Sequence, residues 1–415
     1  MLDAAQLPEQ LKRRGRSAPR SFRIAMVAAC PFPAPRGTPI RIYRIAEMLA
    51  LRGHTVDVFT YHLGERSTQQ PFNVHRISRI PTYKKLDPGP SYQKLLIMDP
   101  LLTAKVTWGI KSRRYDIVHA HHFEGLLAAL PGSSMFSTPI VFDVHTLLES
   151  ELPAYELGLP KRWLSRIGRS LDRRLPPMSD HIIAVSEQIR ERLLEHGAVS
   201  ADRISLIPNG IESFFLSCRR PRPLASEGDA TYLVYAGNLA TYQGIELLLK
   251  AFADAHSTKP ELRLLMLTDS GLSNYESLAR ELGIREYIDV ANPGPEELVT
   301  ILSEASVAAN PRSTCSGLPQ KLLNYMAAGC PIVSCEGSGA HIDNGTTGLL
   351  VENENVAAFS QAILRLLDDP VLARRLGGNA KAYVRENLSW EKTAECIEEV
   401  YDKLTRQLTG AHEDR

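Results

Sequence analysis

Short apolar segments alternate with helix-like segments through the first half of the chain. We predict strands at residues 22–30, 55–60, 74–77, 116–121, 140–145, 181–186 and 204–207. Short, nearly continuous apolar strands separated by helices are typical of a parallel sheet that helices cover on both faces. The pattern therefore predicts a doubly wound α/β domain for this half.

The same alternation begins again after residue 230. Strands are predicted at residues 231–237, 262–268, 287–291, 307–310 and 332–335, each joined to the next by a helix. We therefore expect a second Rossmann-like parallel sheet. Ligands of such sheets bind beyond the carboxyl ends of the strands, and two sheets that face each other create a cleft.

The length of the chain indicates more than one domain, because 415 residues exceed what one hydrophobic core usually organises. We assign residues 1–20 to a disordered basic tail, 21–208 to an N-terminal domain, 209–229 to a linker, 230–388 to a C-terminal domain, and 389–415 to a helix that crosses back towards the N-terminal domain.

The net charge of +1 conceals an uneven distribution. Residues 1–208 contain 29 Lys and Arg against 19 Asp and Glu, and the remainder contains 19 against 28. A basic half suggests that the N-terminal domain meets an anionic surface or substrate. Nucleic acid is not supported as a partner, because the sequence has no basic module interleaved with aromatic residues.

Neither a membrane span nor a secretory signal is apparent. No run approaches the roughly 18 uninterrupted apolar residues of a membrane helix, and the first twenty residues lack the apolar core of a signal peptide. The six cysteines show no C-x-x-C spacing. Reduced thiols in a cytoplasmic protein are therefore expected, with no metal framework.

Residues 310–331 are the strongest candidate for a binding site. A predicted strand leads into a polar loop and then into a helix whose first turn contains Pro319. Free backbone N–H groups and the positive end of the helix dipole favour a bound anion there. Gln320, Lys321 and Asn324 lie within one helical turn, so two of them can reach one ligand. An ordinary α/β turn with a polar first helical turn would give the same pattern.

Several segments carry a resemblance to a known family. They are RGTPIR at residues 36–41, ALRGHTVDVFT ending at residue 60, DIVHAH at 116–121, VFDVHT at 141–146, IAVSE at 183–187, IPNGIE at 207–212, YAGNLATYQGIELLLKAF at 235–252, and the loop and helix at 310–331. In this order and spacing they resemble the GT-B glycosyltransferases, specifically glycosyltransferase family 4. The resemblance covers residues 22–405.

The resemblance implies transfer of a sugar from a nucleotide-sugar, UDP- or GDP-linked, to an acceptor with retention at the anomeric carbon. It implies no metal ion and no resident cofactor. His145 matches the family's cleft histidine near the sugar and phosphate, although a structural hydrogen bond is the alternative. Gly37, followed by Thr38, matches a glycine loop that approaches the donor phosphate closely, although a flexible turn is the alternative there.

Two pairs of positions depart from the family pattern. Where the family commonly has an arginine and a lysine, the chain has Asn238 and Gln243. Where the family commonly has two glutamates, it has Ser316 and Asn324. Stabilisation of the departing diphosphate then depends on other groups. They are Lys321, Arg312, the helix start at Pro319 and backbone amides near Gly37.

We therefore predict two catalytic residues, His145 and Lys321. The predicted donor-binding residues are Gly37, Thr38, Gly237, Asn238, Gln243, Arg312, Ser316, Gly317, Leu318, Pro319 and Asn324. Base recognition is expected near residues 290–293. Two alternatives compete with a transferase: an inactive nucleotide-sugar-binding partner subunit, and a nucleotide-sugar epimerase of similar shape.

Three neighbouring histidines have the composition of a metal site. His119 and His121 share one face of the predicted strand, whereas His122 points away, and the family binds no metal there. A role in the core or the cleft wall is expected.

The acceptor side is predicted from a basic helix at residues 161–174. Its apolar residues Trp163, Leu164, Ile167 and Leu171 can pack inward, or the helix can lie on an anionic bilayer. The loop at residues 81–102 mixes Tyr83, Lys84, Lys85, Tyr92 and Lys94 with an apolar end. Both features favour a glycan, glycolipid or lipid-linked acceptor, and a cytoplasmic enzyme held reversibly on the inner membrane leaflet.

Overall fold

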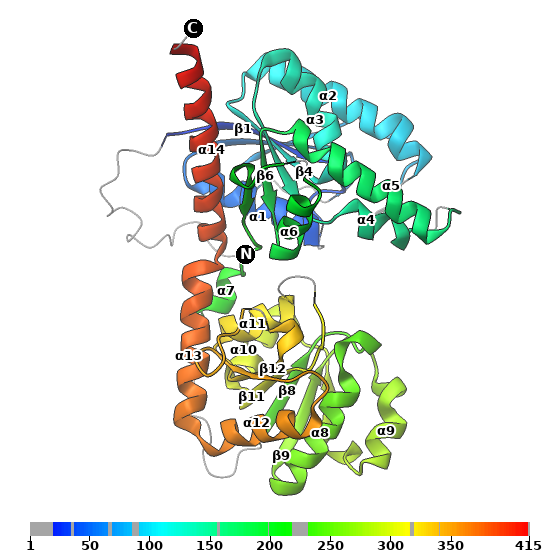
Figure 1. Cartoon of the computed structure of the whole chain (residues 1–415), viewed down its shortest axis with the longest axis vertical. Helices are drawn as coiled ribbons and strands as arrows, with labels where there is room; N and C mark the ends of the chain where they lie inside the picture. The colour runs from blue at the N-terminus through cyan, green and yellow to red at the C-terminus, as the bar shows by residue number, and fades with distance from the viewer. Residues whose placement is uncertain are drawn as a thin grey trace. The chain divides into compact units, whose positions relative to one another are not determined.

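The structure is a computed structural model that describes residues 20–34, 37–64, 69–84, 91–155, 158–197, 199–217, 231–315, 319–339 and 341–413 (Figure 1). The predicted basic tail lies outside these residues except for Arg20, as does most of the predicted linker. The chain divides into two compact units, Met1–Val141 and Phe142–Arg415. The domain boundary predicted at residue 208 stays a prediction.

The described strands form two parallel sheets, as the sequence predicts. The first has seven strands in the order β3-β2-β1-β4-β5-β6-β7. They are β1 Arg23–Ala28, β2 Thr55–Thr60, β3 Asn73–Arg76, β4 Ile117–His121, β5 Ile140–Val144, β6 His181–Ala184 and β7 Ile204–Leu206. The second has six strands in the order β10-β9-β8-β11-β12-β13. They are β8 Thr231–Ala236, β9 Leu262–Leu267, β10 Ile288–Ala291, β11 Val307–Asn310, β12 Ile332–Cys335 and β13 Leu349–Val351.

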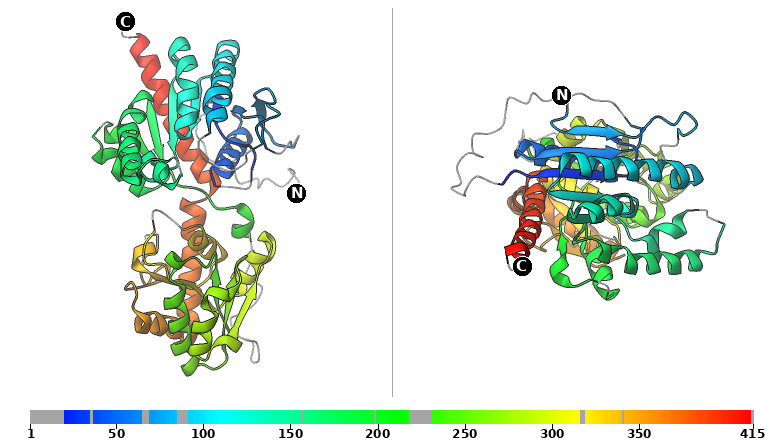
Figure 2. Two further views of the ribbon diagram at one scale, coloured as in Figure 1. Left: turned by 90° about the vertical axis from the view of Figure 1, so that its right-hand side faces the viewer. Right: turned by 90° about the horizontal axis from the view of Figure 1, so that it is seen from above.

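Helices connect the strands in both sheets (Figure 2). Those in the first half are α1 Gly37–Leu51, α2 Asp99–Arg113, α3 His122–Phe136, α4 Leu148–Glu151, α5 Lys161–Arg174, α6 Glu187–Glu195 and α7 Ser213–Ser217. Those in the second half are α8 Ile245–Thr258, α9 Glu276–Glu281, α10 Pro295–Glu304, α11 Gln320–Ala328, α12 Val356–Asp368, α13 Pro370–Asn387 and α14 Trp390–Glu413. The fold class predicted from the sequence is confirmed.

The second sheet separates two apolar cores, because successive side chains of a strand point to opposite faces. Leu233 and Tyr235 of β8 belong to the core that α8 and α12 cover. Val234 and Ala236 of the same strand belong to the core that α10, α11 and α13 cover. Each core also contains inward residues of β11 and β12. The short strand β13 is absent from the sequence-based prediction, because a three-residue apolar segment gives too weak a pattern.

Helix α5 differs from the inward-packed stripe that its apolar residues suggest. Leu164 is buried, but Trp163 is 53% exposed and Ile167 is 42% exposed. The buried row is instead Leu164, Gly168 and Asp172. A Cβ on Gly168 would lie 2.3 Å from the backbone oxygen of Leu148, so the glycine allows the backbone of α4 to pack directly on α5.

Five cysteines are free among the described residues, namely Cys30, Cys315, Cys330, Cys335 and Cys396. This agrees with the expected reduced thiols for the described part of the chain. None of the described helices combines the length and the apolar character that a membrane span requires.

Candidate functional site

The loop between β8 and α8 is built on two glycines with left-handed backbone angles. Gly237 has φ +143° and Gly244 has φ +74°. A Cβ on Gly244 would lie 2.2 Å from the backbone oxygen of Pro311, so only glycine allows this loop to approach the loop that follows β11. The two loops leave neighbouring strands at their carboxyl ends, where parallel sheets bind ligands.

Buried polar groups hold the loop after β11 in place. The Asn310 side chain is fully buried, and its Nδ2 donates to Ser334 Oγ and Ser338 Oγ, each at 2.8 Å. Ser338 Oγ in turn donates to the backbone oxygen of Arg312 at 2.6 Å. These buried hydrogen bonds fix the backbone that carries Arg312, although Asn310 Oδ1 has no hydrogen-bond partner among the described residues.

Lys321 connects the two loops through hydrogen bonds. Its Nζ donates to Gln243 Oε1 at 2.7 Å, and Gln243 Nε2 donates to Asn238 Oδ1 at 3.3 Å. The same Nζ lies 4.5 Å from the centre of the Tyr235 ring, within the range of a cation–π contact. The structure therefore brings three of the predicted residues, Asn238, Gln243 and Lys321, into one cluster.

Arg312 is the second cation of this cluster. Its guanidinium lies 4.9 Å from the centre of the Tyr242 ring, and its Nε donates to the backbone oxygen of Thr314. Burial, and then the nearby Arg312 charge, lowers the pKa of Lys321 from its usual value to about 7. Lys321 is therefore a cation whose charge changes near neutral pH.

The start of α11 has the form that the sequence predicts. Pro319 is the N-cap residue, and its side chain makes no capping hydrogen bond. The helix ends at Gly329, which has φ +77°. Gln320 Nε2 donates to Asn324 Oδ1 at 3.3 Å, so these two amides pair with each other. The predicted contacts Ser316, Gly317 and Leu318 lie outside the described residues.

Two further predicted residues belong to the beginning of the chain. Gly37 and Thr38 open α1, and a Cβ built on Gly37 would meet no protein atom within 4 Å. None of the described residues therefore requires glycine at this position. Its role at a donor phosphate stays a prediction.

His145 directly follows β5. Its side chain is only 7% exposed, and its Nε2 lies 4.0 Å from Asp143 Oδ1. This places it at the carboxyl end of a strand in the first sheet, as the sequence predicts.

The histidines of β4 are core residues. The His119 and His121 rings stack with centroids 4.4 Å apart, and both side chains are buried. His122 has φ +61°, and its Nδ1 lies 2.6 Å from Glu124 Oε2. His119 and His121 are therefore buried, as the predicted core role requires, and with Asp143 they form a group whose candidate ligand atoms lie within 4.8 Å of one another.

Sequence reasoning missed the two tyrosines of the cluster. Tyr235 lies beneath Lys321, and its OH donates to the backbone oxygen of Asn238 at 2.7 Å. Tyr242 faces Arg312. The sequence could have indicated them, because both tyrosines lie in the same segment as Asn238 and Gln243, which differ from the family pattern.

Comparison with protein families accounts for most of the chain. Residues 35–213 match the sequence model of Glycosyltransferase Family 4, and residues 230–369 match that of the Glycosyl transferases group 1. The chain belongs to glycosyltransferase family 4.

Curated relatives of this family 4 glycosyltransferase span almost its whole length. The D-inositol 3-phosphate glycosyltransferase of Acidothermus cellulolyticus is 27% identical, covering 94% of this chain and 92% of the relative. That of Corynebacterium aurimucosum is 25% identical, covering 95% of this chain and 99% of the relative.

Solved structures show the same GT-B fold. Sucrose-phosphate synthase from Thermosynechococcus elongatus has a TM-score of 0.68 at 22% identity, covering 94% of this chain and 100% of that one. Anabaena HepE in complex with UDP has a TM-score of 0.66 at 17% identity, covering 92% and 100%. The family 4 enzyme described above is thus a glycosyltransferase with a GT-B fold.

Proposed function

We propose that the enzyme transfers a sugar from a UDP- or GDP-linked donor, with retention, to a glycan, glycolipid or lipid-linked acceptor. The observation that carries this proposal is the cluster of Lys321, Gln243 and Asn238 beside Arg312, at the carboxyl ends of β8 and β11. The solved complex of HepE with UDP supports a uridine nucleotide as donor. The named relatives support sugar transfer as the reaction.

The cluster has the charge that a diphosphate leaving group requires. Negative charge grows on the diphosphate as the bond to the sugar breaks, and preorganised donors near that charge lower the barrier. Lys321 and Arg312 supply positive charge, and Asn238 and Gln243 supply amide N–H groups. The backbone N–H groups at the start of α11 add further donors.

Lys321 supplies the positive charge that the family pattern places at residues 238 and 243, in the loop after β8. The loop after β8 carries the amides Asn238 and Gln243 at the two departing positions. Lys321 approaches this loop from α11, and its Nζ donates to Gln243. The positive charge is thereby provided by a different element in nearly the same place. We assign His145 to the reacting sugar, where its buried imidazole would bond to a sugar hydroxyl.

A donor screen followed by a transfer assay tests this proposal. Thermal-shift measurements with UDP, GDP, ADP and TDP sugars identify the donor. Transfer to glycolipid and lipid-linked acceptors is then followed with a labelled sugar, and NMR of the product reads the anomeric configuration. An inverted product would refute retention. Tight nucleotide binding without turnover would favour the inactive subunit, and release of an isomerised nucleotide-sugar would favour the epimerase.

Association with an anionic membrane is the second part of the proposal, and an exposed apolar surface supports it. Tyr92 is 87% exposed, Leu95 65%, Leu96 69% and Trp108 70%. These residues lie on or next to the short helical segment Lys94–Met98 and α2. Exposed apolar patches of this kind, in a basic part of a chain, are typical of surfaces that meet a bilayer.

Two residues of the loop at residues 81–102, which was predicted to face the membrane, have structural roles instead. Tyr83 is buried, and Lys94 is held in an ion pair with Glu124. They are therefore structural, because burial and pairing remove them from solvent. Lys85 lies outside the described residues.

Flotation with vesicles tests the membrane surface. The enzyme should float with vesicles that contain anionic lipid, and the double variant Leu95→Ser with Leu96→Ser should stay in the soluble fraction. Val371→Ser is the matched control, because Val371 is 68% exposed but lies on α13. Equal flotation of the enzyme and the double variant, or no preference for anionic lipid, would refute this part.

A further inference from the structure

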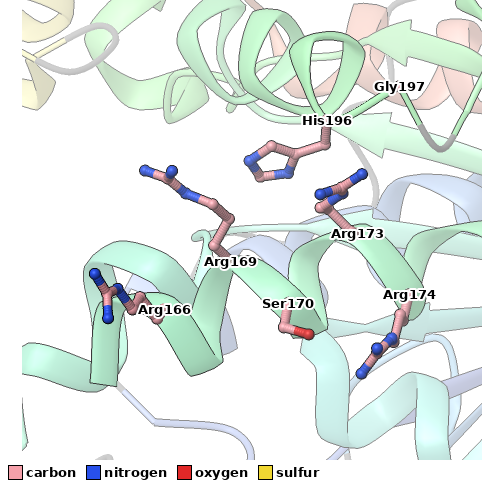
Figure 3. A pocket seen from close by; sticks show the side chains of 7 residues that line it. All are labelled: Arg166, Arg169, Ser170, Arg173, Arg174, His196 and Gly197. Carbon is pink, nitrogen blue, oxygen red and sulfur yellow. The ribbon is translucent and has the colours of Figure 1, made fainter. Parts of the chain in front are cut away.

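A pocket of about 510 Å³ lies between α5 and the residues that follow α6 (Figure 3). It is lined by Arg166, Arg169, Ser170, Arg173, Arg174, His196 and Gly197. Figure 3 shows Arg169 and Arg173 extending from α5 toward His196, which extends from the end of α6. None of these residues was a candidate for the donor site.

Three of the four arginines of this pocket have no counter-ion among the described residues. Arg169 is paired with Glu149, which also lies 3.7 Å from His196 Nε2. Arg166, Arg173 and Arg174 form no ion pair with any described residue. Four arginines outnumber the two carboxylates near them, Glu149 and the buried Asp172, which leaves a positive potential, and like charges three or four residues apart on a helix repel each other.

The helix dipole explains only part of this pattern. Arg173 and Arg174 occupy the last turn of α5, where cations are favoured. Arg166 lies in the middle of the helix, and His196 belongs to a different segment. The helix dipole therefore does not explain why Arg173 and His196 meet at one pocket.

His196 provides an independent indication of a ligand. Its side chain is only 8% exposed, and its Nδ1 has no hydrogen-bond partner among the described residues. A buried ring nitrogen without a partner is uncommon in a folded protein, because its desolvation costs free energy unless a water, an ion or a ligand bonds to it. The ring lines the pocket next to the unpaired arginines.

We propose that this pocket binds a phosphate group, with Arg173 contacting the anion, His196 Nδ1 donating a hydrogen bond to it, and Arg166 and Arg174 adding positive potential. Guanidinium groups match phosphate oxygens in geometry and charge. The Ser170 hydroxyl offers one more donor. The site does not depend on the proposed donor site, because it shares no residue with it.

The phosphate can belong to a lipid headgroup or to a free ligand. A neighbouring row of α5 carries Trp163 and Ile167, both exposed, beside Ser170 and Arg174 of the pocket. A tryptophan at this place suits the interface of a bilayer. The test therefore contains one arm for each source.

Calorimetric titration with inorganic phosphate and with pyrophosphate measures the free-ligand arm. The titrations are repeated in the Lys321→Gln variant, so that anion binding at the donor site is separated from binding at the pocket. Arg173→Gln and His196→Gln should each weaken binding about tenfold or more. Arg162→Gln is the matched control, since Arg162 is an exposed arginine of α5 that does not line the pocket.

Flotation measures the lipid arm, with phosphatidic acid vesicles compared with phosphatidylcholine vesicles. Capture by phosphatidic acid that Arg173→Gln abolishes, without measurable binding of free phosphate, identifies a headgroup site. Free phosphate binding that needs Arg173 and His196 identifies a soluble ligand. Binding in neither arm would overturn the proposal, and so would equal losses in Arg162→Gln and Arg173→Gln. Thermal melting confirms that each variant is folded, and nucleotide binding should stay unchanged in all three.

Discussion

The protein holds its cations in two different ways. In the donor cluster, Lys321 is partly buried and bonded to Gln243, and Arg312 faces an aromatic ring. In the pocket beside α5, most of the arginines are exposed and unpaired within the described chain. The first arrangement fixes each charge in position, whereas the second concentrates charge without fixing it.

This difference has consequences for how each region binds an anion. A partly buried lysine has a lowered pKa, so its charge responds to pH and to a neighbouring ligand. An arginine stays charged at every physiological pH, but an exposed one is screened by salt. The donor cluster should therefore be sensitive to single substitutions and to pH, and the pocket should be sensitive to ionic strength.

The largest effect is expected from Lys321→Met. The variant removes the cation that lies between the two loops, and transfer should fall by about 10²- to 10³-fold in kcat. Steady-state kinetics with the identified donor measures this. Lys250→Met, an exposed lysine on α8, is the control and should change kcat less than about twofold. Equal activity of the two variants would place the leaving-group charge elsewhere.

The second largest effect is expected at Gly244, in the loop that carries Asn238 and Gln243. Gly244→Ala would place a Cβ 2.2 Å from the Pro311 oxygen, at a residue with φ +74°. We expect a loss of about 2–3 kcal/mol in the free energy of unfolding, together with weaker donor binding. Denaturant unfolding measures it. Gly271→Ala, whose Cβ would meet nothing within 4 Å, should cost less than about 1 kcal/mol. Similar losses in both variants would show that the loop contact is unimportant.

Local sequence patterns predicted the strands and the helix α11 well. The apolar periodicity of β8 and β11, the proline before α11 and the glycine after it are all properties of neighbouring residues. The sequence alone therefore identifies the carboxyl end of β11 as a candidate site.

Contacts between distant segments could not be predicted in this way. The bond from Lys321 to Gln243 joins residues 78 positions apart, and it exists because β8 and β11 are neighbours in the sheet. His196 and the arginines of α5 line one pocket although they belong to different segments of the chain, which local periodicity does not reveal.

Only Leu164 of the four apolar residues of α5 is buried, because the row of α5 that packs inward otherwise contains a glycine and an aspartate. Asp172 accepts hydrogen bonds from the backbone N–H groups of Leu148 and Glu149, at 3.0 and 2.9 Å. Gly168 lies against the same segment. A glycine and an aspartate thus form the buried row, where an apolar stripe was the simpler expectation.

The third effect is a pH dependence of nucleotide binding. Lys321 is protonated below its pKa of about 7 and becomes neutral above it. Binding of the diphosphate favours the charged form, so the Kd should rise with pH above about 7, by at most about tenfold per pH unit. Calorimetry at several pH values measures it. Lys321→Arg is the control, because its charge does not change in this range and its profile should be flat. A flat profile in the unmodified enzyme would show that Lys321 does not contact the diphosphate.

The smallest effect should separate the two regions by salt alone. Raising the ionic strength from about 0.1 M to 1 M shortens the screening length from about 10 Å to about 3 Å. Phosphate binding at the pocket, measured in the Lys321→Gln variant, should then weaken by about fivefold, because its arginines are exposed. Nucleotide binding by the unmodified enzyme should weaken by less than about twofold, because Lys321 is partly buried and its hydrogen bond to Gln243 is short. Calorimetric titrations at both salt concentrations make the comparison, with sucrose-matched buffers as a control for water activity. Equal salt dependence in the two regions would mean that burial does not distinguish them, and the donor cluster would then act as a diffuse basic surface as well.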